Sequence, residues 1–240
     1  MSRLLVHVEG ETEETFVNEI LAPHLYRNGF TNVSARIVGN ARLRDRRGGI
    51  RAWSAVRKDV LNHLKEDQTC LTTTMVDFYA LPLSGNNAWP GREAASQLPF
   101  SRKADTVETA LLDDIRGTLG DTTDYRRFIP YVMMYEFEGL LFSDCKGFSR
   151  GIGRPDLADR FQAIRDQFYS PEEINDSPIT APSKRVENLV KGYQKPLLGT
   201  LAVLEIGLDT IRSECPHFGE WLTRLEHWPE KAATVLSIYR

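Results

Sequence analysis

Short apolar runs rich in β-branched residues alternate with longer amphipathic stretches over the first part of the chain. Four runs have the length and composition of buried strands: 3–8, 33–38, 70–78 and 128–135. Between them, apolar residues recur every three or four positions, as on one face of a helix, at 13–28, 50–65 and 106–119. This alternation predicts an α/β fold, in which a mostly parallel, four-stranded sheet is flanked by helices.

A different pattern follows the fourth run. From Pro155 onward the chain is helical in character and is broken by prolines at 171, 178, 182 and 216. With 240 residues, the chain can form one large domain, or a domain of about 150 residues with a smaller appendage. We therefore predict a sheet domain over 1–145 and a helical C-terminal appendage over 146–240 that packs on it.

Charge and cysteine content narrow the class of protein. The net charge of -3 argues against a protein that coats nucleic acid through general basicity, so any contact with phosphate must be local. The three cysteines are far apart and form no CxxC pair, which disfavours disulfides and a zinc ribbon. No apolar run approaches the roughly 20 residues of a membrane helix. We expect a cytoplasmic protein with no membrane partner.

Acidic residues follow the predicted strands. They are Glu9 after the first, Asp77 at the end of the third, Glu136 and Glu138 after the fourth, and Glu13 one turn into the first helix. Ligands of parallel sheets bind at the carboxyl ends of the strands, where these acids would gather. Gathered carboxylates repel one another unless a cation neutralises them, and Mg²⁺ prefers such oxygen ligands. Taken singly, each acid is also typical of a solvated charge or a helix cap.

Three segments that contain these acids resemble motifs of a known protein family. They read VEGETEE over 8–14, TMVDFY over 74–79 and YEFEGLLF over 135–142, and two further motifs are APSKR over 181–185 and IRSECPHF over 211–218. Together the motifs resemble a family of small Toprim-like bacterial proteins of uncharacterised function. The resemblance covers nearly the whole chain and implies a Toprim-like, Rossmann-like core.

The wider Toprim group includes topoisomerases, bacterial primases and nucleases of the overcoming-lysogenisation-defect type. By this resemblance, Glu9, Glu13 and Asp77 are catalytic and hold Mg²⁺ or Mn²⁺, later acids match Glu136 and Glu138, and a downstream catalytic lysine matches Lys184. The resemblance further implies a metal-dependent nuclease acting on DNA or RNA in phage defence or DNA maintenance. It also implies a partner ATPase encoded nearby. Whether the protein forms a homodimer is left open.

One position departs from the Toprim pattern. The usual Asp-x-Asp is here Asp77-Phe78-Tyr79, so the second carboxylate is missing. Either an acid of the fourth strand completes the metal shell, or the protein is a catalytically silent subunit that binds a partner ATPase or nucleic acid. We favour retained activity, with Glu136 as the additional ligand because it lies nearer the predicted strand end.

Basic residues cluster between the second strand and the second helix. A loop that tracks phosphates and a merely solvated loop both fit this pattern. The predicted nucleic-acid contacts are Arg42, Arg44, Arg46, Arg47 and Arg51, joined by Lys184 and Arg185 at the start of a later helix. Such contacts would position a substrate without reading its sequence.

Overall fold

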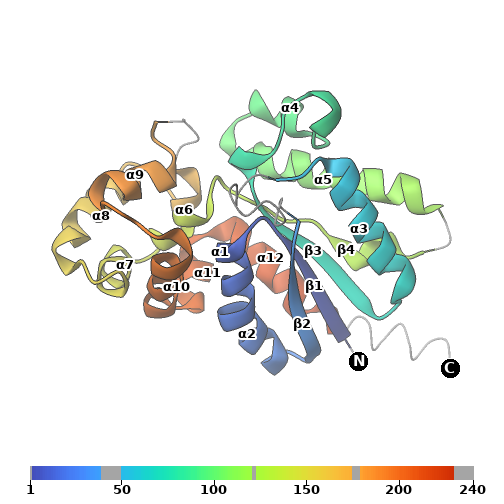
Figure 1. Cartoon of the computed structure of the whole chain (residues 1–240), viewed down its shortest axis with the longest axis horizontal. Coiled ribbons are helices and arrows are strands. Elements are labelled where there is room, and N and C mark those ends of the chain that lie inside the picture. The colour runs from blue at the N-terminus through green and yellow to red at the C-terminus, as the bar shows by residue number, and fades with distance from the viewer. Residues whose placement is uncertain (1, 39–49, 121–122, 175–178, 230–240) are drawn as a thin grey trace.

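Parallel strands form the centre of the protein (Figure 1). The computed structural model describes residues 2–38, 50–120, 123–174 and 179–229. The sheet has the order β2 (Phe30–Ile37), β1 (Ser2–Val8), β3 (Cys70–Asp77), and then β4 (Phe128–Ile129) and β5 (Val132–Met133), which both pair with β3. All of these pairings are parallel. The predicted α/β fold with a mostly parallel sheet flanked by helices is confirmed.

The fourth position in the sheet is shorter than predicted. In place of one strand over 128–135, two short strands pair with β3, at Thr72–Thr73 and at Val76–Asp77. Pro130 and Tyr131 separate them. Proline has no N–H to donate to a ladder, which accounts for the interruption. Pairing nevertheless resumes far enough along β3 to bring the segment after β5 beside Asp77.

Two apolar cores lie on the two faces of the sheet. One contains the buried stripes of α3 (Trp53–Glu66) and α5 (Phe100–Leu119). The other contains those of α1 (Glu11–Phe16), the π-helical turn η1 (Val17–Leu21), α2 (Ala22–Arg27) and α12 (Pro216–Glu226). Figure 1 shows the two groups of helices on either side of the strands. This three-layer arrangement buries the apolar stripe of each helix against a sheet face.

The first helical run begins earlier than predicted. Gly10 is the N-cap, and α1 starts at Glu11, two residues before the predicted start at 13. The run continues through η1 into α2 and ends before Gly29, whose φ of +91° is accessible to glycine at little cost. Its start directly after β1 places both Glu9 and Glu13 at the carboxyl edge of the sheet.

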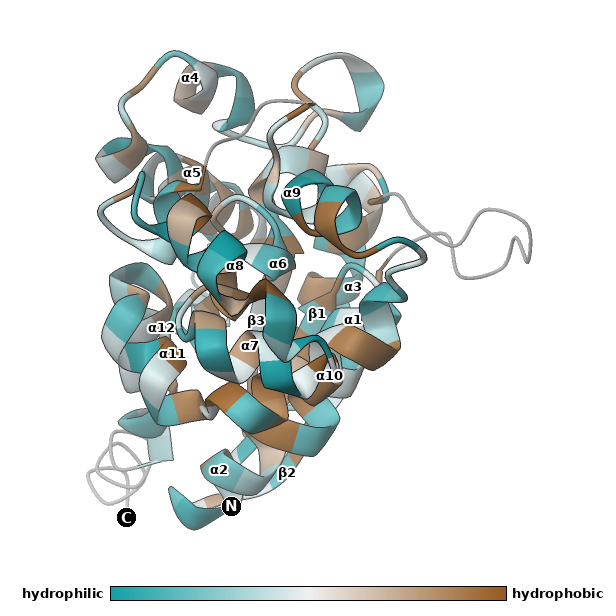
Figure 2. Ribbon diagram, turned by 90° about the vertical axis from the view of Figure 1, so that its left-hand side faces the viewer, coloured by the Kyte–Doolittle hydropathy of each residue, from teal (hydrophilic) through white to brown (hydrophobic). Residues whose placement is uncertain are grey.

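The remaining helices are short and gather at one end of the sheet. They are α6 (Phe137–Leu141), α7 (Cys145–Gly151), α8 (Ala158–Arg165), α9 (Pro182–Leu189), α10 (Lys195–Ile206) and α11 (Leu208–Glu214), and Figure 2 views the molecule from their side. The short helix α4 (Arg92–Ser96) precedes α5. The apolar core of the α1 side includes side chains of α6, α7, α8 and α10. The domain boundary at residue 145 stays a prediction.

Short 3₁₀ turns complete the described elements: η2 (Phe78–Ala80), η3 (Gly85–Asn87), η5 (Tyr125–Arg127), η6 (Pro155–Leu157) and η7 (Pro171–Glu173). The turn η2 matters for the site because it directly follows Asp77. Within the described ranges, no helix combines the length and the apolar character needed to cross a bilayer.

Candidate functional site

Asp77 is the last residue of β3 and is buried at the carboxyl edge of the sheet. Its Oδ1 atom accepts a hydrogen bond of 3.0 Å from the backbone N–H of Phe137. This bond ties the end of β3 to the start of α6. Burial raises the pKa of Asp77 well above its ordinary value, and the nearby Glu9, Glu13 and Glu138 act in the same direction. The aspartate predicted from the sequence therefore lies among the other predicted acids.

Glu9 follows β1 and reaches toward the same point. Its Oε2 atom lies 3.4 Å from the backbone N–H of Asp77, which donates to it. Burial, followed by the charge of Glu13, raises the pKa of Glu9 to about 7. A carboxyl group with this pKa carries a proton part of the time near neutrality, because its surroundings do not stabilise the negative charge. A cation bound here would stabilise that charge.

Glu138 lies within α6 and has no exposed surface. Burial raises the pKa of this carboxyl, and the nearby ammonium of Lys195 opposes the rise. Its Oε1 atom has no hydrogen-bond partner among the described residues. A buried carboxylate oxygen without a partner is costly, since the lost contact with water is not replaced.

Lys195 brings a positive charge into this acidic group, and the sequence reasoning missed it. Its Nζ atom lies 3.0 Å from Glu138 Oε2 and 3.7 Å from Asp77 Oδ2. Burial alone would lower the pKa of Lys195, but the carboxylates of Glu138 and Asp77 outweigh burial and the pKa lies well above its ordinary value. Lys195 is the first residue of α10, far from the strand ends in sequence. Strand ends do not identify a residue in this position, because Lys195 directly follows no strand.

Glu13 and Glu136 each have an oxygen engaged at a helix N-terminus. Glu13 Oε2 accepts from the backbone N–H of Gly10 at 3.0 Å, and Glu136 Oε2 accepts from that of Ser183, in the first turn of α9, at 2.8 Å. These are capping contacts, which carboxylates commonly make. Both acids still act on the site, because their charges raise the pKa of Glu9.

The chain turns into helix after Glu136, which is the N-cap of α6, so Glu136 and Glu138 point to different partners. Glu138 contacts the same ammonium as Asp77. The contacts therefore favour Glu138 over Glu136 as the acid that acts with Asp77, in contrast to the preference drawn from sequence. The two side chains diverge because the chain changes from extended backbone at Glu136 to helix at Glu138, and the metal-binding role predicted for Glu136 stays a prediction.

The oxygen ligands that this site offers are of the chemical type that a hard divalent cation prefers. All the groups are carboxylates, and no cysteine or histidine is among them, which favours Mg²⁺ or Mn²⁺ over softer metals. Within the described part of the chain, however, no three Asp, Glu, His or Cys side chains have the spacing of a completed metal shell. The Lys195 ammonium lies between Asp77 and Glu138, so an ion there would share these carboxylates with it or displace it.

The residues predicted to contact nucleic acid do not join the group of carboxylates in the described part of the chain. Lys184 is half exposed, and its Nζ atom lies 2.7 Å from Glu187 Oε2. Arg185 donates to Thr180 O, and Arg51 donates to Asp59 at 3.3 Å. The remaining loop arginines, Arg42, Arg44, Arg46 and Arg47, lie outside the described residues. Lys195 contacts the carboxylates of the site, whereas Lys184 contacts Glu187. The catalytic role predicted for Lys184 stays a prediction.

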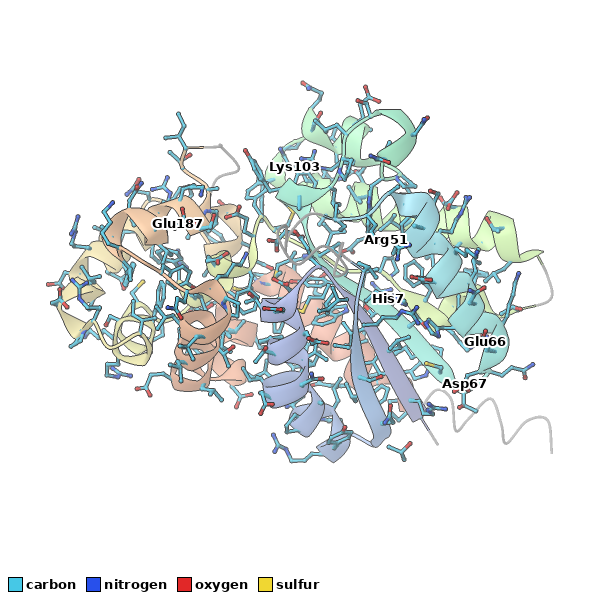
Figure 3. All side chains as sticks on the ribbon, in the orientation of Figure 1. His7, Arg51, Glu66, Asp67, Lys103 and Glu187 are labelled. Carbon is cyan, nitrogen blue, oxygen red and sulfur yellow. The ribbon has the colours of Figure 1, made fainter. Side chains whose placement is uncertain are left out.

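Two further cations lie around Phe78, the residue that follows Asp77. The guanidinium carbon of Arg92 lies 3.9 Å from the centre of the Phe78 ring, and Arg92 Nε donates to Phe78 O at 3.0 Å. The Nζ atom of Lys103 lies 5.6 Å from the same ring. Figure 3 labels Lys103 on α5 and Glu187 on α9, on the two sides of the strand ends. Neither cation follows a strand, and the sequence analysis passed over both.

Tyr79, at the position of the missing second aspartate, lies in η2. Its backbone N–H donates to Tyr135 O at 3.2 Å. This bond joins the chain after β3 to the chain after β5, as the bond between Phe137 and Asp77 does one step away. Both bonds tie this segment to the chain after β5, at Asp77 through its side chain and at Tyr79 through its backbone.

Fold and site together define an α/β protein with a desolvated group of carboxylates at the carboxyl edge of a parallel sheet. The chain belongs to the family described as a domain of unknown function, DUF4276, whose model matches residues 8–226. None of the curated proteins matches the chain.

Two solved structures are similar to the chain, and both are of the C-terminal region of the OLD protein of Xanthomonas campestris pv. campestris. The one phased with iodine has 16% identity and a TM-score of 0.42, and the one phased with mercury has 15% identity and a TM-score of 0.37. In each case the match covers 95% of this chain and 98% of the other. With TM-scores below 0.5, neither similarity supports an inference about the site.

Proposed function

We propose that this protein is a Mg²⁺- or Mn²⁺-dependent nuclease that hydrolyses phosphodiester bonds of DNA or RNA. One observation carries the proposal: Glu9, Asp77 and Glu138 are desolvated carboxyls with raised pKa values, and among the described residues a single ammonium, that of Lys195, contacts Asp77 and Glu138. Burial and mutual repulsion disfavour the ionised form of all three groups, and additional positive charge would favour it. A divalent cation supplies that charge, and the Toprim-like sequence motifs agree with this assignment.

Glu9, Asp77 and Glu138 would hold the cation. When bound, such an ion supplies a water of lowered pKa and neutralises charge on the phosphate. The Lys195 ammonium lies at the same carboxylates and would stabilise the negative charge that develops on a phosphate oxygen. Glu13 and Glu136, each with one oxygen in a helix cap, would fix the geometry of the neighbouring backbone.

Phosphate binding would use the cations beyond Phe78. Arg92 and Lys103 are buried against the aromatic ring that directly follows Asp77, so their charges would attract a backbone phosphate at this edge electrostatically. The loop with Arg42, Arg44, Arg46 and Arg47 would extend this contact along the nucleic-acid backbone. A partner ATPase and a role in phage defence or DNA maintenance in the cytoplasm belong to the same proposal and depend on the sequence resemblance.

Incubating the purified protein with labelled plasmid, single-stranded DNA and RNA tests the proposal. We expect cleavage with Mg²⁺ or Mn²⁺ and none in EDTA. Asp77→Asn and Glu138→Gln should each abolish cleavage, whereas Asp113→Asn, at an exposed position of α5, should leave it unchanged. Cleavage that survives in EDTA, or in both site variants, would contradict the mechanism.

A second function is supported by the ion pair between Lys195 and Glu138. The ammonium already neutralises part of the acidic group, as it would in a catalytically silent subunit that only binds a partner ATPase or nucleic acid. Calorimetric titration with Mn²⁺ separates the two functions. Binding that is lost in Glu138→Gln supports the nuclease, and no binding by the wild-type protein, with nucleic acid present, supports the silent subunit.

A further inference from the structure

Helix α10 is apolar on two opposite sides, yet the protein covers only one of them. Its sequence is KPLLGTLAVLEI, and the side that faces the protein consists of Gly199, Ala202, Val203 and Ile206. A Cβ atom added at Gly151 would lie 2.6 Å from the Cα of Ala202, so α7 and α10 are already in backbone contact. A surface helix normally has one apolar side toward the core and polar residues on the opposite side. The outer side of α10 therefore lacks a partner within the described part of the chain.

Three leucines form this outer side: Leu197, Leu201 and Leu204, which are 56%, 43% and 58% exposed. Figure 2 shows the brown, apolar ribbon of α10 on the side that faces the viewer. Their spacing of four and then three residues is that of a helix-pairing seam, in which each leucine packs between residues of a facing helix. Scattered exposed leucines need no explanation, but a seam with this period does.

A groove continues the seam at its C-terminal end. It has a volume of about 490 Å³ and is lined by apolar side chains of the first helical run and of α10 and α11, namely Ile20, Pro23, Val203, Leu204 and Leu208. The charged residues along it include Glu19, Arg27 and Asp209. The apolar surface available to a partner is thus wider than one helix.

We propose that α10 pairs with α10 of a second copy of this chain, antiparallel, about a two-fold axis at Leu201. In this arrangement Leu197 of each copy meets Leu204 of the other. An interface of this kind uses the same patch on both copies, so its charges must complement themselves. The row of leucines can pack against its own copy, since leucine packs well against leucine.

Charges at the two ends of α10 favour the antiparallel arrangement. Lys191 is exposed just before the helix, whereas two acids, Glu19 and Asp209, and one base, Arg27, are exposed near its C-terminal end, which therefore has an excess of negative charge. Lys191, Glu19 and Asp209 form no ion pair with another described residue. Antiparallel pairing would bring Lys191 of one copy toward the acids of the other, and a parallel pair would set like charges together. The helix dipoles also align favourably only in the antiparallel case.

Sedimentation equilibrium of the full chain tests the proposal. We expect a concentration-dependent dimer, and Leu201→Glu should raise its dissociation constant by about tenfold or more because a charge would be buried at the axis. Leu83→Glu is the matched control, since Leu83 is 45% exposed and lies far from α10 in sequence. Unchanged circular dichroism and thermal unfolding would show that both variants fold. A monomer at all concentrations, or a dimer that Leu201→Glu leaves intact, would overturn the proposal.

Charge exchange and cross-linking test the geometry. Lys191→Glu and Asp209→Lys should each weaken the dimer, and the double variant should restore part of the loss. Leu201→Cys should form a disulfide-linked dimer under mild oxidation, because the two-fold axis places this residue opposite itself, and the native cysteines are buried. No cross-link at Leu201 would contradict the axis. Since none of these residues contacts the carboxylates, the variants should bind Mn²⁺ as the wild type does, which keeps this test separate from the nuclease proposal.

Discussion

The Lys195 ammonium lies 3.0 Å from Oε2 of Glu138, a residue with no exposed surface. The two residues are brought together by α6 and α10, and the same ammonium reaches Asp77 at the end of β3. This contact joins the helical C-terminal part of the chain to the carboxyl edge of the sheet. Any cation that binds the carboxylates must act in the presence of this charge.

Removing the charge of Lys195 should destabilise the metal-free protein. In Lys195→Met, Glu138 and Asp77 lose their nearest counter-charge, and breaking a buried pair of this kind costs about 3–5 kcal/mol. The side chain of Lys195 is 35% exposed, so we expect a value toward or below the low end of this range. Urea unfolding in EDTA at pH 7.5 measures the loss. Lys195→Arg is the control, because it retains the charge.

The same variant distinguishes the roles of the ammonium and the cation. If a divalent ion binds these carboxylates, Mn²⁺ should restore much of the stability that Lys195→Met loses, because a ligand that binds only the folded state stabilises it. Nuclease activity should stay low in the presence of Mn²⁺, since the ion does not replace a donor to phosphate. Equal stability of Lys195→Met and wild type would show that the pair contributes nothing.

Glu138 and Glu136 should differ in their effect on metal affinity. Glu138→Gln removes the carboxylate that lies with Asp77 around the ammonium, so we expect a loss of Mn²⁺ affinity of tenfold or more by calorimetry. Glu136→Gln keeps an oxygen that can accept from the N–H of Ser183, so affinity should change little and stability by about 1 kcal/mol or less. The reverse pattern of affinities would assign the metal to Glu136.

Much of the sheet and the acids at its edge could be predicted from the sequence. Strand ends can be read because an apolar, β-branched run stops at a polar residue, and the carboxyl edges of parallel strands must coincide. Asp77 is the clearest example, since β3 ends at this residue. The N-cap at Gly10 was missed, because the backbone and not a side chain begins that helix.

The contacts made by α10 could not be predicted in the same way. Lys195 reaches Glu138 across a long stretch of chain, and such a contact depends on how α7 and α10 pack, which local periodicity does not encode. The direction of Glu136 depended on the residue at which strand gives way to helix, and boundaries are read only to within a few residues. The contact of Lys195 and the direction of Glu136 both depend on tertiary packing rather than on the type of element.

The arginine loop should position the nucleic-acid substrate and take no part in bond cleavage. Arg44, Arg46 and Arg47 lie outside the described residues, so this prediction depends on their sequence alone. Phosphate contacts release counterions, and neutralising all three arginines should flatten the salt dependence of nucleic-acid binding by up to about three units of slope. Fluorescence titrations at several salt concentrations measure the slope. An unchanged slope would make the loop an ordinary solvated surface.

Stability of the metal-free protein should depend on pH through Glu9. Burial and the charge of Glu13 raise the pKa of this carboxyl from 4.5 to about 7, so the folded protein retains a proton that the unfolded chain releases. The stabilising contribution is therefore fully present below about pH 4.5 and is lost as pH rises through about 7, and it amounts to roughly 3 kcal/mol. Asp77 and Glu138, whose pKa values are also raised, act with the same sign.

His7 acts with the opposite sign and makes a matched comparison necessary. Burial, with a smaller effect of His63, lowers the pKa of His7 to about 3, so its contribution is present above pH 6.5 and is lost as pH falls. The difference between wild type and Glu9→Gln removes this background. Urea unfolding in EDTA from pH 5 to 8 should show wild type losing stability relative to Glu9→Gln as pH rises, and Mn²⁺ should restore wild type at pH 8 but not at pH 5. Parallel pH profiles of the two proteins would mean that Glu9 titrates as an ordinary exposed glutamate.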